Sequence, residues 1–480
     1  MDFNKIKSTV AGTALALSAE RGLDVAGWTL RRIETDATTV IRLPSIYTTR
    51  EGRFLRQPNP HPREVIMSPS EEVWVTVYGR HKADGNEYMG EAAGQFVSDD
   101  ESAVKATLAT LATAACSQPN KPYPFSDTGA VFPQVELADH ELHELSYAAL
   151  LARVQRFSDA VLSAAAGEFG IEVSNLEVFV RRMRNRIETS SGIALEYPAT
   201  RTDAEVCFIA RFGDKVAEHT VRPHARRLRD LDPQVLVTMG ANHSRGIAQA
   251  GPPPQHSGPV ALAGAATHDF VKLDYEPLSW HSSGRAVYEK MSRYVKGKQA
   301  WGDKPLAGDP VTIFSDPLVP FGPDSRIEGD AQPVRRVCLL KDGCYDEILG
   351  GLRYYHYLGL LDTTVGTNGA SQGAKPSGPA GNTVVPAGPH RTAELLGPGR
   401  TIVVRSFSDF RTDPTSGDFA SEIRLGEIRE DGSEKYFKGG LLIGNWFDAL
   451  ADMKLSSETM AQDGYYGPAT IRVGNLQIAG

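Results

Sequence analysis

Cysteine is scarce in this chain, which has only four among its 480 residues, Cys116, Cys207, Cys338 and Cys344. No two of them form a CxxC pair. Four cysteines are too few for a disulfide scaffold in a chain of this length, and the missing CxxC pair argues against thiol redox chemistry and against a zinc ribbon. We therefore expect reduced thiols that are mostly buried.

Long hydrophobic runs and an excess of basic residues are missing as well. No stretch reaches about 18 consecutive apolar residues, and the N-terminus carries Asp2, Lys5 and Lys7 before a modest alanine-rich run instead of the apolar core of a signal peptide. We therefore expect a cytoplasmic protein. The formal net charge of −8 argues against a general nucleic-acid-binding surface.

The first half of the chain has the patterns of an α+β domain. Apolar residues at helical spacing predict helices over residues 3–21, 102–115 and 139–169, the second one capped by Asp99 or Asp100. Strand patterns cover residues 26–33, 38–43, 73–78, 176–187 and 193–197. The proline-rich stretch 57–62 predicts an irregular surface excursion, and the basic stretch 215–232 predicts a helix with a solvated face.

A linker divides the chain. Residues 251–258 contain three consecutive prolines, which favour an extended spacer, so we expect an N-terminal domain over 1–250 and a C-terminal domain over 259–480. Beyond the linker, strands are predicted over 260–265, 334–340 and 345–349, with a turn at 341–343 and a helix over 285–295. Residues 366–389, rich in Gly, Pro, Ser and Asn, predict a long flexible loop of the kind that overlies binding clefts.

The chain closes on a strand pattern. After the turn pair Gly467-Pro468, apolar residues alternate at Ile471 and Val473, and again at Leu476 and Ile478 after a break at Gly474-Asn475. A segment this apolar is expected to be an integral strand of the second domain.

Several stretches of the second half occur in the order found in one known family. They are VCLLKDG at 337–343, YYHYLG at 354–359, PTSGDFA at 414–420, GGLLIGNWFDAL at 439–450 and the closing strand. Together they resemble the TldD/TldE (PmbA) family over residues 259–480. The resemblance implies a two-domain α+β fold, with an N-terminal α+β domain and a β-rich C-terminal domain built on a large, mostly antiparallel sheet.

The active subunit of that family binds zinc through the motif HExxxH and a cysteine of the C-terminal segment. Two imidazoles and a thiolate hold the metal, and the glutamate carboxylate takes a proton from the metal-bound water. The corresponding residues here are AATHDFVKL at 265–273. His268 matches the first histidine, Asp269 replaces the glutamate and Leu273 the second histidine. No cysteine follows Cys344, so residues 462–464, where the resemblance places the cysteine, offer no thiolate. The resemblance therefore implies a TldE-like chain that binds no metal itself.

Four residues are candidates for contact with a substrate. His268, Asp269 and Lys272 either line a cleft and touch substrate or are structural remnants, and Asp418 either orients substrate or caps a turn. His140 and His143 share a helix face but lack a third ligand nearby, so the acidic residues around them are read as helix capping. No Walker loop, Rossmann GxGxxG or GxSxG motif occurs in a supporting context.

The resemblance implies a metal-free subunit of a heterodimeric zinc metalloprotease, whose TldD-like partner carries the zinc and performs hydrolysis. This chain would shape the cleft for a peptide or a peptide-derived substrate, including the precursor of a natural product. One alternative is a stand-alone homodimeric binding protein of the same fold. Another is an independent hydrolase with a site rebuilt from His268 and Asp269.

Overall fold

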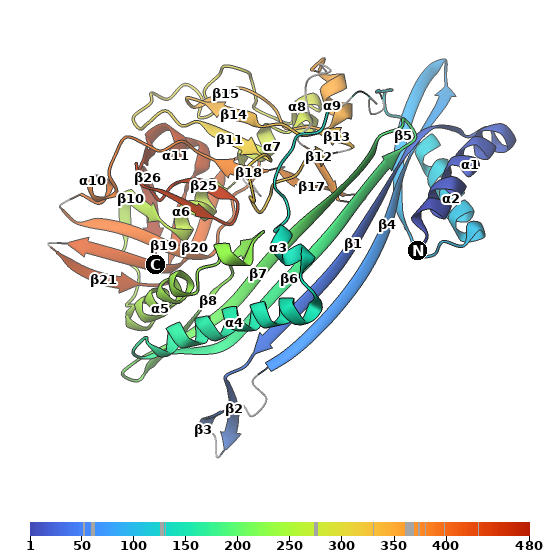
Figure 1. Ribbon diagram of the computed structural model, residues 1–480. Coiled ribbons are helices and arrows are strands. Elements are labelled where there is room, and N and C mark those ends of the chain that lie inside the picture. The colour runs from blue at the N-terminus through green and yellow to red at the C-terminus, as the bar shows by residue number, and fades with distance from the viewer. Residues whose placement is uncertain are drawn as a thin grey trace.

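The computed structural model describes residues 1–50, 53–58, 63–124, 129, 131–272, 277–329, 331–360, 369–372, 375–379, 381–397, 399–430 and 432–480. Long antiparallel strands run diagonally through the molecule, and the C-terminal elements gather at one side of them (Figure 1). The fold is mixed α+β with large, mostly antiparallel sheets, as expected from the sequence. All four cysteines are free and only half-buried, so they are less buried than expected.

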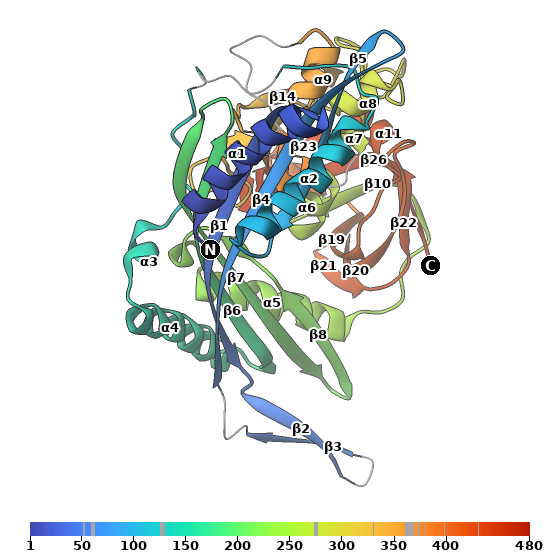
Figure 2. The ribbon, with the colours of Figure 1, turned by 90° about the vertical axis from the view of Figure 1, so that its right-hand side faces the viewer.

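The N-terminal half forms one seven-stranded antiparallel sheet in the order β5-β4-β1-β6-β7-β8, with β9 also paired to β7. Its strands are β1 Asp24–Arg42, β4 Arg63–Ala83, β5 Asn86–Phe96, β6 Ile171–Thr189, β7 Ala194–Phe212, β8 Lys215–Val221 and β9 His224–Ala225. The two strands predicted at 26–33 and 38–43 are one strand, because β4 and β6 pair with β1 through the polar residues between them. Strands β2 (Ser45–Arg50) and β3 (Arg53–Pro58) form a hairpin that projects from the sheet (Figure 2), so Gln57 and Pro58 are strand residues and 59–62 lie outside the described residues.

Two pairs of helices pack on this sheet. Helices α1 (Phe3–Arg21) and α2 (Glu101–Cys116) pack together against β1, β4 and β5, whereas α4 (Tyr147–Ala166) and α5 (Pro233–Gln249) pack on β6, β7 and β8 (Figures 1 and 2). Asp100 caps α2 by accepting from the backbone N–H groups of Ser102 and Ala103. The single helix predicted over 139–169 is two, α3 (His140–Glu144) and α4, because Leu145 is extended and Ser146 caps the second helix.

The helix predicted over the basic stretch 215–232 is wrong. Gly213, with φ of 58°, makes the turn that brings β8 back against β7, and β9 and the short 3-10 helix η1 (Leu228–Asp230) follow. The arginines of this stretch, Arg222, Arg226, Arg227 and Arg229, therefore lie in the segments that follow β8 and β9, and Arg226 is buried there. Pairing with the long strand β7 outweighs the weak local helix preference.

The C-terminal half contains a ring of five strands. Strand β10 (His256–Ala263) pairs with both β19 (Thr401–Asp409) and β26 (Thr470–Ala479), which closes the order β10-β19-β20-β22-β26. The remaining strands of this sheet are β20 Asp418–Glu430, β21 Ser433–Phe437, β22 Leu441–Asn445 and β23 Lys454–Leu455. The linker predicted over 251–258 lies between α5 and this ring, and its last three residues already belong to β10. The domain boundary there stays a prediction.

A six-stranded sheet lies beside the ring in the order β15-β14-β11-β18-β25-β24. Its strands are β11 Ile313–Asp316, β14 Val337–Lys341, β15 Cys344–Tyr345, β18 Asn382–Val384, β24 Thr459–Gln462 and β25 Tyr465–Pro468. Two small ladders join β12 (Glu328–Gly329) to β13 (Gln332–Pro333) and β16 (Gly369–Gln372) to β17 (Lys375–Pro379). The helices of this half are α6 Ala265–Val271, α7 Pro277–His281, α8 Gly284–Tyr288, α9 Leu352–Tyr357, α10 Thr392–Leu396 and α11 Trp446–Asp452.

Three predictions for this half need correction. The helix predicted over 285–295 ends at Tyr288, since Lys290 has a positive φ of 57°. The strand predicted over 345–349 is only the two residues of β15. The loop predicted over 366–389 contains strands β16, β17 and β18, and its residues 366–368, 373–374 and 380 lie outside the described residues.

The closing strand is built as its pattern predicts. Ile471, Val473, Leu476 and Ile478 are buried in the core of the C-terminal half. The alternation changes phase at Gly474-Asn475 because the pairing with β10 shifts there, where one residue of β10 opposes two of β26. β26 contacts β10, β22 and β23, so the C-terminal segment is central to this half.

Candidate functional site

Helix α6 carries His268 and Asp269, and a third candidate residue, Lys272, is its C-cap. Strand β10 runs into it through Gly264, whose positive φ of 60° turns the chain sharply. Ala266, Thr267, Phe270 and Val271 are buried, and the indole Nε1 of Trp446 donates to the Phe270 carbonyl at 2.9 Å. This packing fixes the opposite face of the short helix, from which His268, Asp269 and Lys272 project.

His268 is held on two sides. Its Nδ1 lies 2.8 Å from Oδ1 of Asp269, and its ring packs edge-on against Tyr465 with 6.3 Å between centroids. The side chain is only 13% exposed, and its Nε2 is buried with no hydrogen-bond partner in the part of the chain that the structure describes. A buried polar atom without a hydrogen-bond partner costs about 1–3 kcal/mol, and Oδ2 of Asp324 is a second such atom at this site.

Lys272 forms an ion pair with the loop before β12. Its Nζ lies 3.8 Å from Oδ2 of Asp324, and the lysine side chain is 13% exposed. The backbone N–H of Asp324 donates to Oδ1 of Asn382, the first residue of β18. The cation of α6 is thereby tied to the six-stranded sheet.

A second polar contact lies at the turn between β24 and β25. Oδ1 of Asp463 accepts from the backbone N–H of His224 at 3.0 Å and lies 3.0 Å from Nδ1 of the same histidine. Burial raises the pKa of Asp463, but the hydrogen bonds and charge of His224, with a smaller effect of His268, outweigh it and leave the pKa below its ordinary value. Tyr465, two positions after Asp463, packs against the ring of His268, so this turn lies beside α6.

Asp418 lies apart from this cluster, at the exposed start of β20. Its carboxylate accepts from Nδ2 of Asn445 at 2.7 Å, and its backbone N–H donates to Ser416. Asn445 also donates to the Ser416 carbonyl and caps α11 through Phe447 and Asp448. The two sequence stretches 414–420 and 439–450 therefore meet here, and Asp418 is part of the junction.

The donor set around α6 does not fit a zinc ion. One imidazole is present, the neighbouring carboxylate contacts it, and the charged Nζ of Lys272 lies on the same face. Position 273 lies outside the described residues and is a leucine. Within the described residues, no group of three or more His, Cys, Asp or Glu side chains is placed to hold a metal. Zinc sites in proteins need three or four such ligands.

Residues 257–480 match the family model described as the PmbA/TldA metallopeptidase C-terminal domain. This C-terminal part of the chain belongs to the TldD/TldE (PmbA) family. No curated protein matches it closely enough to be reported. In the part of this family member that the structure describes, no helix has both the length and the apolar character needed to cross a membrane.

Solved structures share the TldD/TldE fold over the whole chain. TldE from Thermococcus kodakarensis is 17% identical, with a TM-score of 0.72 over 98% of this chain and 100% of that one. A candidate modulator of a DNA gyrase from Thermotoga maritima is 18% identical, with a TM-score of 0.74 over 99% and 100%. A second candidate modulator, from Bacteroides thetaiotaomicron, is 12% identical, with a TM-score of 0.74 over 100% and 99%. At these identities the likeness shows the fold alone.

In the folded chain, residues that the sequence did not single out contact the candidate site residues or lie beside them. His224, Asp324 and Tyr465 come from segments that carry no motif, so nothing in the sequence marked them. Asp463 lies in the segment where the family's zinc-binding cysteine is expected, and that position was the only available signal.

Proposed function

We propose that this chain is a metal-free, TldE-like subunit of a heterodimeric zinc metalloprotease. A TldD-like partner supplies the zinc and the hydrolysis, and this chain helps to hold a peptide or a peptide-derived substrate, such as the precursor of a natural product. The cytoplasmic location expected from the sequence belongs to this proposal. The family membership supports an assembly of the metallopeptidase type. The contacts around α6 support the proposal that the partner binds the zinc and this chain does not.

The single observation that carries the proposal is that a polar contact and an ion pair within the chain lie beside α6, where the zinc-binding chain of the family has its metal ligands. Asp463, in the segment where the thiolate is expected, contacts His224, and Lys272 places an ammonium group 3.8 Å from Asp324. A fixed ammonium disfavours a divalent cation beside it, because like charges repel strongly in a poorly solvated site. The same groups suit a substrate that offers hydrogen-bond donors and acceptors.

We assign substrate contact to His268, Asp269, Lys272 and Asp418. The unmatched Nε2 of His268 would gain a partner on binding. Strand β24 is the last strand of the described six-stranded sheet and leads directly into the turn of Asp463. An extended peptide that adds to such an edge binds through its main chain, with little dependence on sequence.

The experiment compares the lone chain, a TldD-like chain and the co-expressed pair. We expect a stable heterodimer, one zinc-binding chain per pair, and peptide hydrolysis by the pair only. A homodimer that ignores the partner would favour the stand-alone binding protein. Stoichiometric zinc on the lone chain, lost in His268→Ala, would favour an independent hydrolase. Either result contradicts the proposal.

The role of the candidate residues is tested within the pair. Lys272→Met should raise KM for peptide hydrolysis and leave zinc content and heterodimer formation unchanged. Lys298→Met is a matched control, because Lys298 is an exposed lysine on a different segment of the chain. Equal kinetics of the two variants would remove Lys272 from the substrate site.

A further inference from the structure

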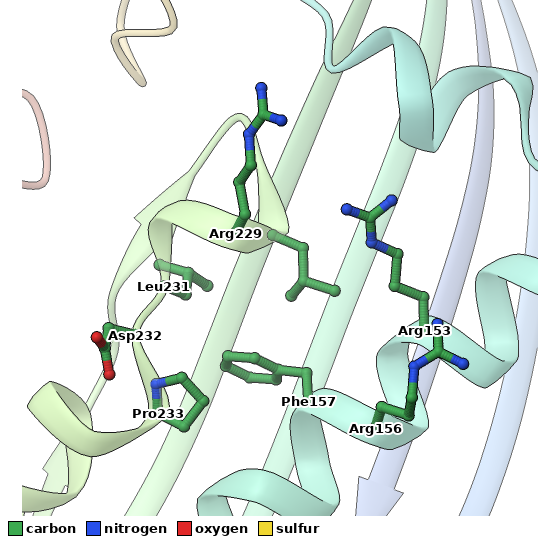
Figure 3. A pocket seen from close by; sticks show the side chains of 8 residues that line it. Arg153, Arg156, Phe157, Arg229, Leu231, Asp232 and Pro233 are labelled. Carbon is green, nitrogen blue, oxygen red and sulfur yellow. The ribbon is translucent and has the colours of Figure 1, made fainter.

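Three arginines surround a hollow of about 540 Å³ between α4 and the segment that leads into α5 (Figure 3). Arg153 and Arg156 project from α4, and Arg229 projects from η1 on the other side. The floor between them is apolar and includes Phe157, Leu228 and Leu231. The hollow therefore combines cationic groups at its rim with an apolar surface beneath them.

The positive charge of the rim is only partly neutralised. Arg153 and Arg229 share one carboxylate, that of Glu141, at 3.0 and 3.4 Å. The guanidinium group of Arg156 makes no ion pair or hydrogen bond with any residue that the structure describes. Asp232 also lines the hollow, but its Oδ1 accepts from two backbone N–H groups as the cap of α5.

We propose that this hollow binds the C-terminal carboxylate of an extended peptide whose last side chain is apolar. A guanidinium group pairs with a carboxylate through two parallel hydrogen bonds, and Arg156 has this capacity unused. The apolar floor buries the last side chain of such a peptide. A small, fully hydrated anion such as phosphate would pair with the arginines but leave the floor uncovered.

The position of the hollow relates it to α6. His224, which contacts Asp463, and Arg229, which lines the hollow, are five residues apart, so their Cα atoms lie at most about 18 Å from each other. An extended peptide rises about 3.3 Å per residue. A peptide anchored by its end in the hollow would span the distance from Arg229 to His224, the contact of Asp463, with about five residues. The inference rests on the proposed function in taking a peptide as the ligand.

The test is peptide binding to the full chain without any partner, measured by fluorescence anisotropy. The probe is a labelled hexapeptide ending in leucine, with a free carboxylate or with a C-terminal amide. We expect the amide to bind about tenfold more weakly, which corresponds to the loss of a charge-assisted hydrogen-bond pair. Arg156→Gln should weaken the free acid by a similar factor and should make no difference to the amide.

Arg411→Gln is the matched control, because Arg411 is an exposed arginine that pairs with Asp409 on a different element. It should bind acid and amide as the unmodified chain does. The proposal is overturned if acid and amide bind equally, if the chain binds neither, or if the preference for the acid survives in Arg156→Gln. Inorganic phosphate that competes at constant ionic strength as strongly as the unlabelled peptide acid would also overturn it, in favour of a simple anion site.

A failure of this inference and a failure of the proposed function can be told apart by experiment. Failure to assemble with a TldD-like chain would leave peptide binding to the hollow unchanged. Failure of the hollow to bind the peptide would leave assembly and zinc stoichiometry of the pair unchanged.

Discussion

His224 and Asp463 are 239 positions apart in the chain, and a single carboxylate oxygen of Asp463 contacts both the backbone N–H and the ring Nδ1 of His224 at 3.0 Å. The contact joins β9 of the N-terminal sheet to the turn between β24 and β25. The turn next to α6 is therefore positioned by a residue of the other half of the chain.

Replacing Asp463 with alanine should lower the free energy of unfolding by about 1–3 kcal/mol at pH 7, since the N–H of His224 loses its acceptor. The folded-state pKa of Asp463 is lowered, so its contribution is present above the ordinary value of 3.8 and is lost as the pH falls through the lower folded value. Urea denaturation of both proteins from pH 7 to pH 3 measures this. The difference between them should shrink only at the acid end, and a constant difference would contradict the assignment.

Arg226 should not tolerate lysine. Its buried guanidinium donates to five backbone carbonyls, those of Leu137, Thr200, Gly322, Pro323 and Ser325. Lysine keeps the charge but has fewer donors in a different geometry, so Arg226→Lys should cost at least about 2 kcal/mol of unfolding free energy. Arg222→Lys, on an exposed side chain of the same segment, should change it by less than about 0.5 kcal/mol. Denaturant titration of both variants measures these free energies. Equal losses in Arg226→Lys and Arg222→Lys would mean that the contacts with the carbonyl groups are unimportant.

Two helical glycines should respond oppositely to alanine. A Cβ at Gly240 in α5 would lie 2.1 Å from Cδ2 of Phe208, so Gly240→Ala should destabilise the protein by about 1–3 kcal/mol. A Cβ at Gly12 in α1 meets nothing within 4 Å, so Gly12→Ala should stabilise it by about 0.5–1 kcal/mol. Thermal unfolding measures both shifts. A stabilising Gly240→Ala would mean that α5 and β7 pack less closely than described.

Stability should fall in mild acid because of a stacked histidine pair. The rings of His219 on β8 and His243 on α5 lie 4.7 Å apart. Burial, followed by His243, Arg424 and Arg222, lowers the pKa of His219 to about 3. Between about pH 6.5 and 3 the unfolded chain binds a proton that the folded chain does not, so this contribution is present above pH 6.5 and decreases as the pH falls.

His219→Phe keeps a stacked ring but removes this proton. It should reduce the slope of unfolding free energy against pH by up to about 1.4 kcal/mol per unit in that range. His140→Gln is the control, because His140 is 70% exposed. An unchanged slope in His219→Phe would show that the ring is protonated in the folded protein.

Local sequence patterns predicted the helices and strands that bury one face and that end at a capping residue or a glycine. Helix α1 ends before Gly22, Asp100 caps α2, and the phase change of β26 falls at Gly474-Asn475, as expected. The same patterns failed for residues 215–232, where pairing with β7 decided between helix and strand. Strand pairing depends on a partner that local periodicity does not encode.

For the site, the chemical groups could be read from the sequence: one histidine in the stretch 265–273, an aspartate in place of glutamate, and no cysteine after Cys344. Which groups contact one another became visible in the folded chain. Asp463 contacts His224 and Lys272 pairs with Asp324 because separate sheets pack beside α6, and such long-range contacts depend on the three-dimensional arrangement of segments and not on their spacing in the chain.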